Sequence, residues 1–76
     1  MTKVEVGQVV SVEMPYSEVM MYMGIAGTVW EVEVKEHCAQ LRKDGREVGG
    51  PVCHGEAGIL WRDGSLYINP LLDRTG

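Results

Sequence analysis

The fold is decided by two stretches of this chain, VEVGQVVSV at residues 4–12 and GIAGTVWEV at residues 24–32. Each stretch places a glycine before a run of β-branched residues, and each run leads into alternating apolar and polar side chains. Glycine reaches the positive φ of tight turns, and valine fits the pleated surface of a sheet. Together the two stretches predict an all-β fold, a small closed barrel.

Strict alternation marks the strand that is predicted over residues 27–36. Its charged side chains share one face, which is typical of a half-buried strand, and its apolar face carries Trp30, Val32 and Val34. A first strand is predicted over residues 4–14, with a bend or bulge at Gly7. The apolar side chains that share one face of this strand are Val10, Val12 and Met14.

Two Asp-Gly pairs, at residues 44–45 and 63–64, predict tight hairpins, because type I′ turns need positive φ at both central residues. The first turn sets Arg42 opposite Glu47 and Leu41 opposite Val48. The second turn sets up the pairs Arg62–Ser65, Trp61–Leu66, Leu60–Tyr67 and Ile59–Ile68. In that register Ile59, Trp61, Leu66 and Ile68 face inward, and Leu60, Tyr67 and Asn69 face outward, side by side.

One short helical turn is predicted near residues 17–23, with Ser17 as its N-cap and Gly24 at its C-terminal end. Four methionines lie in or near this turn, at positions 14, 20, 21 and 23. Because methionine fills irregular gaps in cores, we expect these side chains to plug one end of the barrel. An adaptable surface for a partner is the alternative interpretation.

The chain has 76 residues, which we interpret as one domain over residues 1–76 with a thin core that oligomerisation would help to stabilise. Seven Lys and Arg against eleven Asp and Glu give a net charge of −4. An acidic chain repels phosphate backbones, so nucleic acid is not an expected partner. No apolar run approaches the ~20 residues of a membrane helix. Without a signal-peptide pattern, we expect a cytoplasmic protein with reduced cysteines.

Every histidine and cysteine lies in one of two dipeptides, His37-Cys38 and Cys53-His54. Together these four residues have the ligand types of a Cys₂His₂ zinc site. Adjacent residues of a strand point to opposite faces, however, and no C-x-x-C spacing is present. We therefore expect the cysteines to act as small hydrophobic residues, and we predict neither a metal site nor a catalytic site.

The opening half of the chain resembles the Src-homology-3-like small barrels, including KOW-type domains. The resemblance covers residues 4–36 and lies in Val6-Gly7-Gln8-Val9-Val10-Ser11-Val12, followed after a turn by Gly24-Ile25-Ala26-Gly27-Thr28-Val29. It implies a barrel of five or six strands. KOW-type domains often contact RNA, ribosomal or transcription partners, but their basic surface has no counterpart in this acidic chain.

The last strand is similar to the end of the plasmid-borne, trimethoprim-resistant type II dihydrofolate reductases. Those enzymes are small barrels that form a tetramer around one pore, where a Val-Gln-Ile-Tyr run binds folate and the cofactor NADPH. The matching run here is Leu66-Tyr67-Ile68-Asn69, which keeps the isoleucine. Tyr67 and Asn69 replace the family's glutamine and tyrosine, and the family's pore lysine has no counterpart near residues 12–13. Reductase activity is therefore not expected.

From these features we expect a non-catalytic binding or assembly module that uses the outer face of the last hairpin. The module would self-associate or dock a protein partner, without a cofactor, through Leu60, Tyr67, Ile68 and Asn69. The first alternative is an oligomeric pore-type small-molecule binder or reductase with NADPH as its cofactor. The second alternative is a small metal-binding protein, for which the candidate ligands are His37, Cys38, Cys53 and His54.

Overall fold

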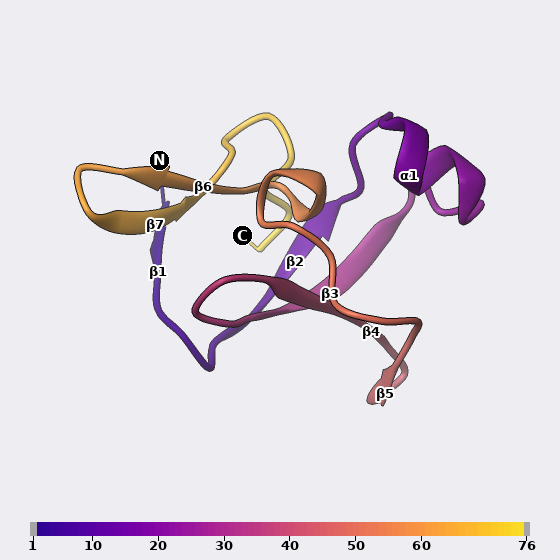
Figure 1. Cartoon of the computed structure of the whole chain (residues 1–76), viewed down its shortest axis with the longest axis horizontal. Coiled ribbons are helices and arrows are strands. Elements are labelled where there is room, and N and C mark those ends of the chain that lie inside the picture. Colours follow the sequence, from indigo (N-terminus) through magenta and orange to yellow (C-terminus); the bar gives the residue numbers. More distant parts are fainter. Residues whose placement is uncertain (1, 76) are drawn as a thin grey trace.

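A computed structural model of the chain describes residues 2–75, which form mainly antiparallel strands (Figure 1). A three-stranded sheet has the order β1-β7-β6, from Thr2–Val4, Ser65–Ile68 and Ile59–Arg62. A four-stranded sheet has the order β2-β3-β4-β5, from Val9–Glu13, Val29–Val34, Ala39–Lys43 and Arg46–Glu47. The helical elements are α1 (Glu18–Tyr22) and a 3-10 turn (Gly55–Ala57), and no helix among the described residues has the length and apolarity to cross a membrane. The predicted all-β class is confirmed.

The first strand, predicted over residues 4–14, is divided at Gly7 into two strands that belong to different sheets. Gly7 has a φ of 94°, and the N–H of Gln8 donates to the carbonyl of Glu5 at 3.0 Å, which closes a turn. β1 therefore pairs with β7, whereas β2 pairs with β3. The bend at Gly7 is confirmed, but the single strand was wrong, because a glycine at positive φ reverses the chain here. With the two-residue β5, this division gives seven strands within residues 2–75 instead of five or six.

Apolar side chains of both sheets meet in one core, while the two ladders stay separate within residues 2–75. The predicted inward residues of the four-stranded sheet are all buried, namely Val10, Val12, Trp30, Val32 and Val34. The three-stranded sheet contributes Val4, Ile59, Leu66 and Ile68. Full burial of one such side chain contributes roughly 1.5–3 kcal/mol, so this layer of facing side chains is the main source of stability.

Helix α1 is a single capped turn between β2 and β3, at one end of the molecule (Figure 1). The Oγ of Ser17 accepts a hydrogen bond from the N–H of Met20 at 3.2 Å, as predicted for an N-cap. Met14 and Met20 are fully buried, and Met23 packs against the core. Met21 was wrongly placed in the core, because consecutive helical residues point about 100° apart and Met21 turns to solvent.

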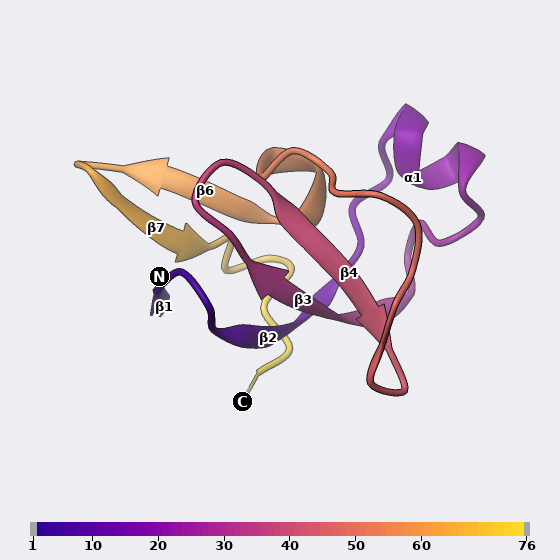
Figure 2. The same ribbon diagram turned by 60° about the horizontal axis from the view of Figure 1, so that its bottom comes forward.

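Both predicted hairpins are present (Figure 2). Their residue pairs are the predicted ones. Their turns have positive φ at both central residues, Asp44 and Gly45 in one and Asp63 and Gly64 in the other. In β6 and β7 the pairs are Ile59–Ile68, Leu60–Tyr67, Trp61–Leu66 and Arg62–Ser65. This second hairpin projects from the body at the end opposite α1 (Figures 1 and 2).

The C-terminal segment, residues 72–75, covers the outer edge of β2. The N–H of Glu13 donates to the carbonyl of Leu72 at 2.8 Å, and the N–H of Arg74 donates to the carbonyl of Ser11 at 3.0 Å. These bonds satisfy backbone groups that an edge strand would otherwise expose. The four-stranded sheet is therefore closed along this side.

Candidate functional site

The β6–β7 hairpin carries the residues that were expected to form an interface, and the centre of its outer face is apolar. Leu60 lies directly opposite Tyr67, which in turn lies opposite Lys3 of β1. Leu60 and Tyr67 are half-buried, and Lys3 is exposed. An aliphatic side chain, an aromatic ring and a lysine thus form one row across the three-stranded sheet.

Ile68 and Asn69, which were also expected at the interface, serve the fold of the chain itself. Ile68 is fully buried in the core, on the face opposite to that of Tyr67. The Oδ1 of Asn69 accepts a hydrogen bond from the N–H of Leu71 at 3.1 Å, and its carbonyl accepts one from the N–H of Leu72 at 2.9 Å. Asn69 therefore forms the turn that follows β7, and Tyr67 is the side chain that the outer face of this strand presents.

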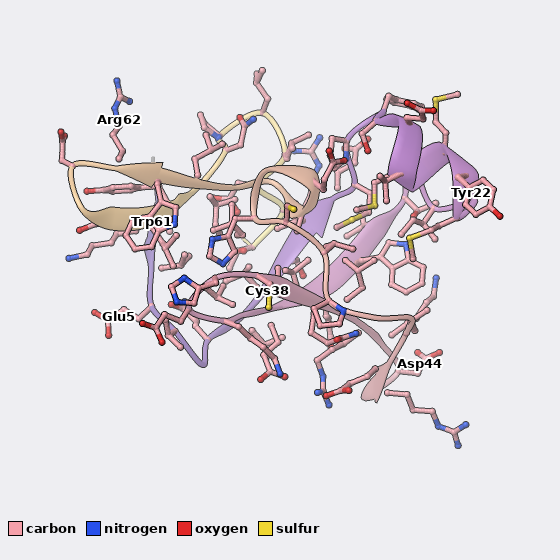
Figure 3. All side chains as sticks on the ribbon, in the orientation of Figure 1. Glu5, Tyr22, Cys38, Asp44, Trp61 and Arg62 are labelled. Atoms are coloured by element: carbon pink, nitrogen blue, oxygen red, sulfur yellow. The ribbon has the colours of Figure 1, made fainter. Side chains whose placement is uncertain are left out.

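Trp61 was predicted to face the core, and the structure corrects this prediction, because its side chain is 57% exposed. Trp61 does share the inward face of Ile59 and Leu66, so the register was right. It lies closer to the hairpin tip, however, where the hairpin extends past the rest of the molecule (Figure 3). The result is an exposed indole at the rim of the core, with its ring centroid 6.4 Å from that of His54.

His54 is a buried residue that holds two loops together. Its Nε2 lies 2.7 Å from the carbonyl oxygens of both Lys35 and Cys38. Because carbonyl oxygens only accept hydrogen bonds, Nε2 carries a hydrogen and is the donor. A nitrogen that donates in this way is neither a base nor a metal ligand. His54 thus fixes residues 35–38 against the 3-10 turn.

The four residues that were considered as metal ligands do not converge. The side chain of His37 is 86% exposed and lies 3.7 Å from the carboxylate of Glu36. Cys38 and Cys53 are free cysteines, of which Cys53 is exposed. Among residues 2–75, no three His, Cys, Asp or Glu side chains lie close enough together to hold a metal ion.

A second apolar surface, which we call the α1 surface, lies on the helix and the segment before it. It consists of Tyr16, Val19, Met21 and Tyr22, all exposed. Tyr22 points away from the body of the molecule (Figure 3). The methionine-rich sequence is compatible with such a surface, but of these methionines only Met21 belongs to it, and Met14 and Met20 are buried.

The outer face of the four-stranded sheet carries polar side chains together with the exposed Val9 and Val29. The cation at its centre, Arg42, is paired. The Nη1 of Arg42 lies 3.1 Å from the Oε1 of Glu33 and 3.9 Å from the Oε1 of Glu47, the predicted cross-strand partner. Its Nη2 donates to the carbonyl of Gly45 at 2.9 Å. The guanidinium is therefore occupied within the chain, and this face offers an acidic, solvated surface.

The described residues enclose no pocket. No protein-family model, no curated protein and no solved structure matches this chain. Two exposed apolar features are the candidate functional surfaces, namely the hairpin with Trp61 and the α1 surface.

Proposed function

We propose that this chain is a non-catalytic assembly module that self-associates through its β6–β7 hairpin. One observation carries the proposal: a projecting hairpin bears apolar side chains on both faces. Leu60 and Tyr67 lie on the outer face, and Trp61 lies exposed on the other. Aromatic side chains bury a large apolar area and are enriched in protein interfaces.

The energetics favour covering these residues. Burial of apolar area contributes roughly 25 cal/mol per Å². A domain of this size buries a smaller fraction of its surface on folding than a larger domain does, so its own core contributes less. A contact that covers Trp61, Leu60 and Tyr67 would add apolar burial that the single chain lacks. Self-association therefore offers this small domain a second hydrophobic contact.

The hairpin is better suited to an interface than the α1 surface is. Its strands are joined by a ladder of four residue pairs, so the backbone that presents its side chains is held in place before binding. A surface with an ordered backbone loses less conformational freedom on association. The α1 surface rests on a five-residue helix, which offers fewer fixed positions.

The proposal is tested by replacing one tyrosine on each surface and measuring the solution mass at several protein concentrations. We expect Tyr67→Ala to weaken self-association while its circular dichroism stays that of the wild type. Tyr22→Ala is the matched control, because Tyr22 is an exposed tyrosine outside the hairpin. If Tyr22→Ala weakened association and Tyr67→Ala did not, the hairpin would be excluded in favour of the α1 surface.

A further inference from the structure

Strand β6 lies at an edge of the three-stranded sheet. The turn that joins β6 to β7 determines which residues of β6 form backbone hydrogen bonds with β7. The type I′ turn at Asp63 and Gly64 makes Arg62–Ser65 a bonded pair, so the bonded residues of β6 are even-numbered. The N–H of Asn69 donates to the carbonyl of Gly58 at 2.8 Å, which continues the same pattern. The N–H and C=O of Trp61 therefore point away from β7, toward the open edge.

The other edges within residues 2–75 are protected. Residues 72–75 cover β2, and Val52 pairs with Ala39 at the start of β4. β5 has only two residues, and β1 is a three-residue strand with Lys3 at its centre. Short strands and lysines are common protections of sheet edges. β6 instead carries an exposed tryptophan at the residue whose backbone groups face outward.

We infer that two copies of this chain pair edge to edge through β6, antiparallel, about a two-fold axis at Trp61. The backbone of Trp61 supplies one N–H donor and one C=O acceptor. A two-fold rotation that places Trp61 opposite the partner's Trp61 therefore forms a hydrogen bond with each of these groups on both copies. The three-stranded sheet would then continue as one six-stranded sheet across the dimer. The inference rests on the proposed self-association and specifies its partner and its geometry.

The side chains of β6 are compatible with this register. Trp61 would meet the partner's Trp61 on the inner face, where paired aromatic rings are favourable. On the outer face Arg62 would lie opposite the partner's Leu60, and Leu60 is the neighbour of Tyr67. The pairing is confined to residues 60–62, because the outward N–H of Ile59 already donates to the carbonyl of His54 at 2.8 Å. Like charges that lie directly opposite each other destabilise a sheet, and this register contains no such pair.

The test combines backbone exchange with a proline variant. Amide hydrogen exchange of Trp61 is measured in the wild type at low and high protein concentration, and we expect it to slow as dimers form. Trp61→Pro removes the outward N–H without removing a bond to β7, and proline is tolerated at edges. Trp61→Ala is the matched control, because it removes the same side chain and keeps the N–H. We expect the dissociation constant of Trp61→Pro to exceed that of Trp61→Ala by roughly tenfold, since each dimer loses two hydrogen bonds.

Edge pairing fails if the Trp61 amide exchanges at the same rate in samples that light scattering shows to be dimeric. It also fails if the two variants, both folded by circular dichroism, have equal dissociation constants. If Tyr67→Ala still weakens the dimer in either case, hairpin self-association stands with another contact geometry. A wild type that is monomeric at every concentration overturns both the edge pairing and the proposed function.

Discussion

The indole ring of Trp61 lies 6.4 Å from the imidazole of His54, with the ring planes inclined by 50°. His54 is itself fixed, because its Nε2 donates to two backbone carbonyls of residues 35–38. An exposed aromatic side chain at the open edge thus lies beside an anchored ring. The contact limits the freedom of Trp61 before any partner arrives, which lowers the entropy cost of association.

The anchoring role of His54 predicts a loss of stability in His54→Ala. The variant leaves the carbonyl of Lys35 without its donor and removes a buried ring, so we expect the free energy of unfolding to fall by about 1–3 kcal/mol. Chemical denaturation measures this change. His37→Ala is the control: its side chain is exposed, and its effect should stay within about 0.5 kcal/mol. Equal effects of the two substitutions would contradict the anchoring role.

Gly58 combines a left-handed backbone with close packing, and the two contributions can be separated. Its φ is +80°, and an added Cβ would lie 2.8 Å from Cγ1 of Val12 and 3.0 Å from Cδ1 of Leu72. Gly24 has a similar φ of +73°, with nothing within 4 Å of the same position. We expect Gly24→Ala to cost about 1–2 kcal/mol from the backbone alone, and Gly58→Ala to cost about 1–3 kcal/mol more from overpacking. Denaturant titration of both variants gives the difference between their losses in the free energy of unfolding. A difference of zero would show that the side chains around Val12 rearrange without an energetic cost.

Asp73 connects the two ends of the chain through its carboxylate. It accepts hydrogen bonds from the N–H of Thr75 at 2.9 Å and from the hydroxyl of Thr2 at 3.0 Å. The bond from the Thr75 backbone, followed by those from the hydroxyls, lowers the pKa of Asp73 below its ordinary value despite some desolvation. Because the pKa is lower in the folded state, this stabilisation is present above the unfolded pKa of about 3.9 and is lost as the pH falls through the folded value.

Asp73→Asn should therefore lose less stability than the wild type does on acidification below about pH 4. The measurement is the free energy of unfolding of both proteins across that range. Thr2→Ser keeps the hydroxyl donor and should follow the wild-type curve. Parallel curves for Asp73→Asn and the wild type would show that this carboxylate does not contribute to the acid response.

The hairpins were predictable because their determinants are local. Asp63-Gly64 supplies the positive φ of a two-residue turn, and such a turn by itself determines the pairing of Leu60 with Tyr67. Gly7 was harder to interpret, because a positive φ can produce either a bulge within one strand or a turn between two. The choice depends on the neighbours of β1 and β2, which residues 4–14 alone do not specify.

The candidate site was predictable only in part, because exposure depends on the length of each element relative to the core. Alternation placed Trp61 on the inward face correctly, but the hairpin extends past the core at that position. Ile68 was expected both in the core and at the interface, and its side chain is fully buried in the core. Open edges arise from the order of strands in a sheet, so sequence periodicity carried no signal for the edge at β6.

The most direct test of self-association is the solution mass of the wild type, measured by light scattering on a sizing column over a series of protein concentrations. One chain has a mass of 8.4 kDa. A contact along four-residue strands is small, so we expect a dimer that dissociates on dilution. The predicted result is a mass that rises with concentration toward twice that of one chain. A mass of 8.4 kDa at every concentration would contradict self-association through the hairpin.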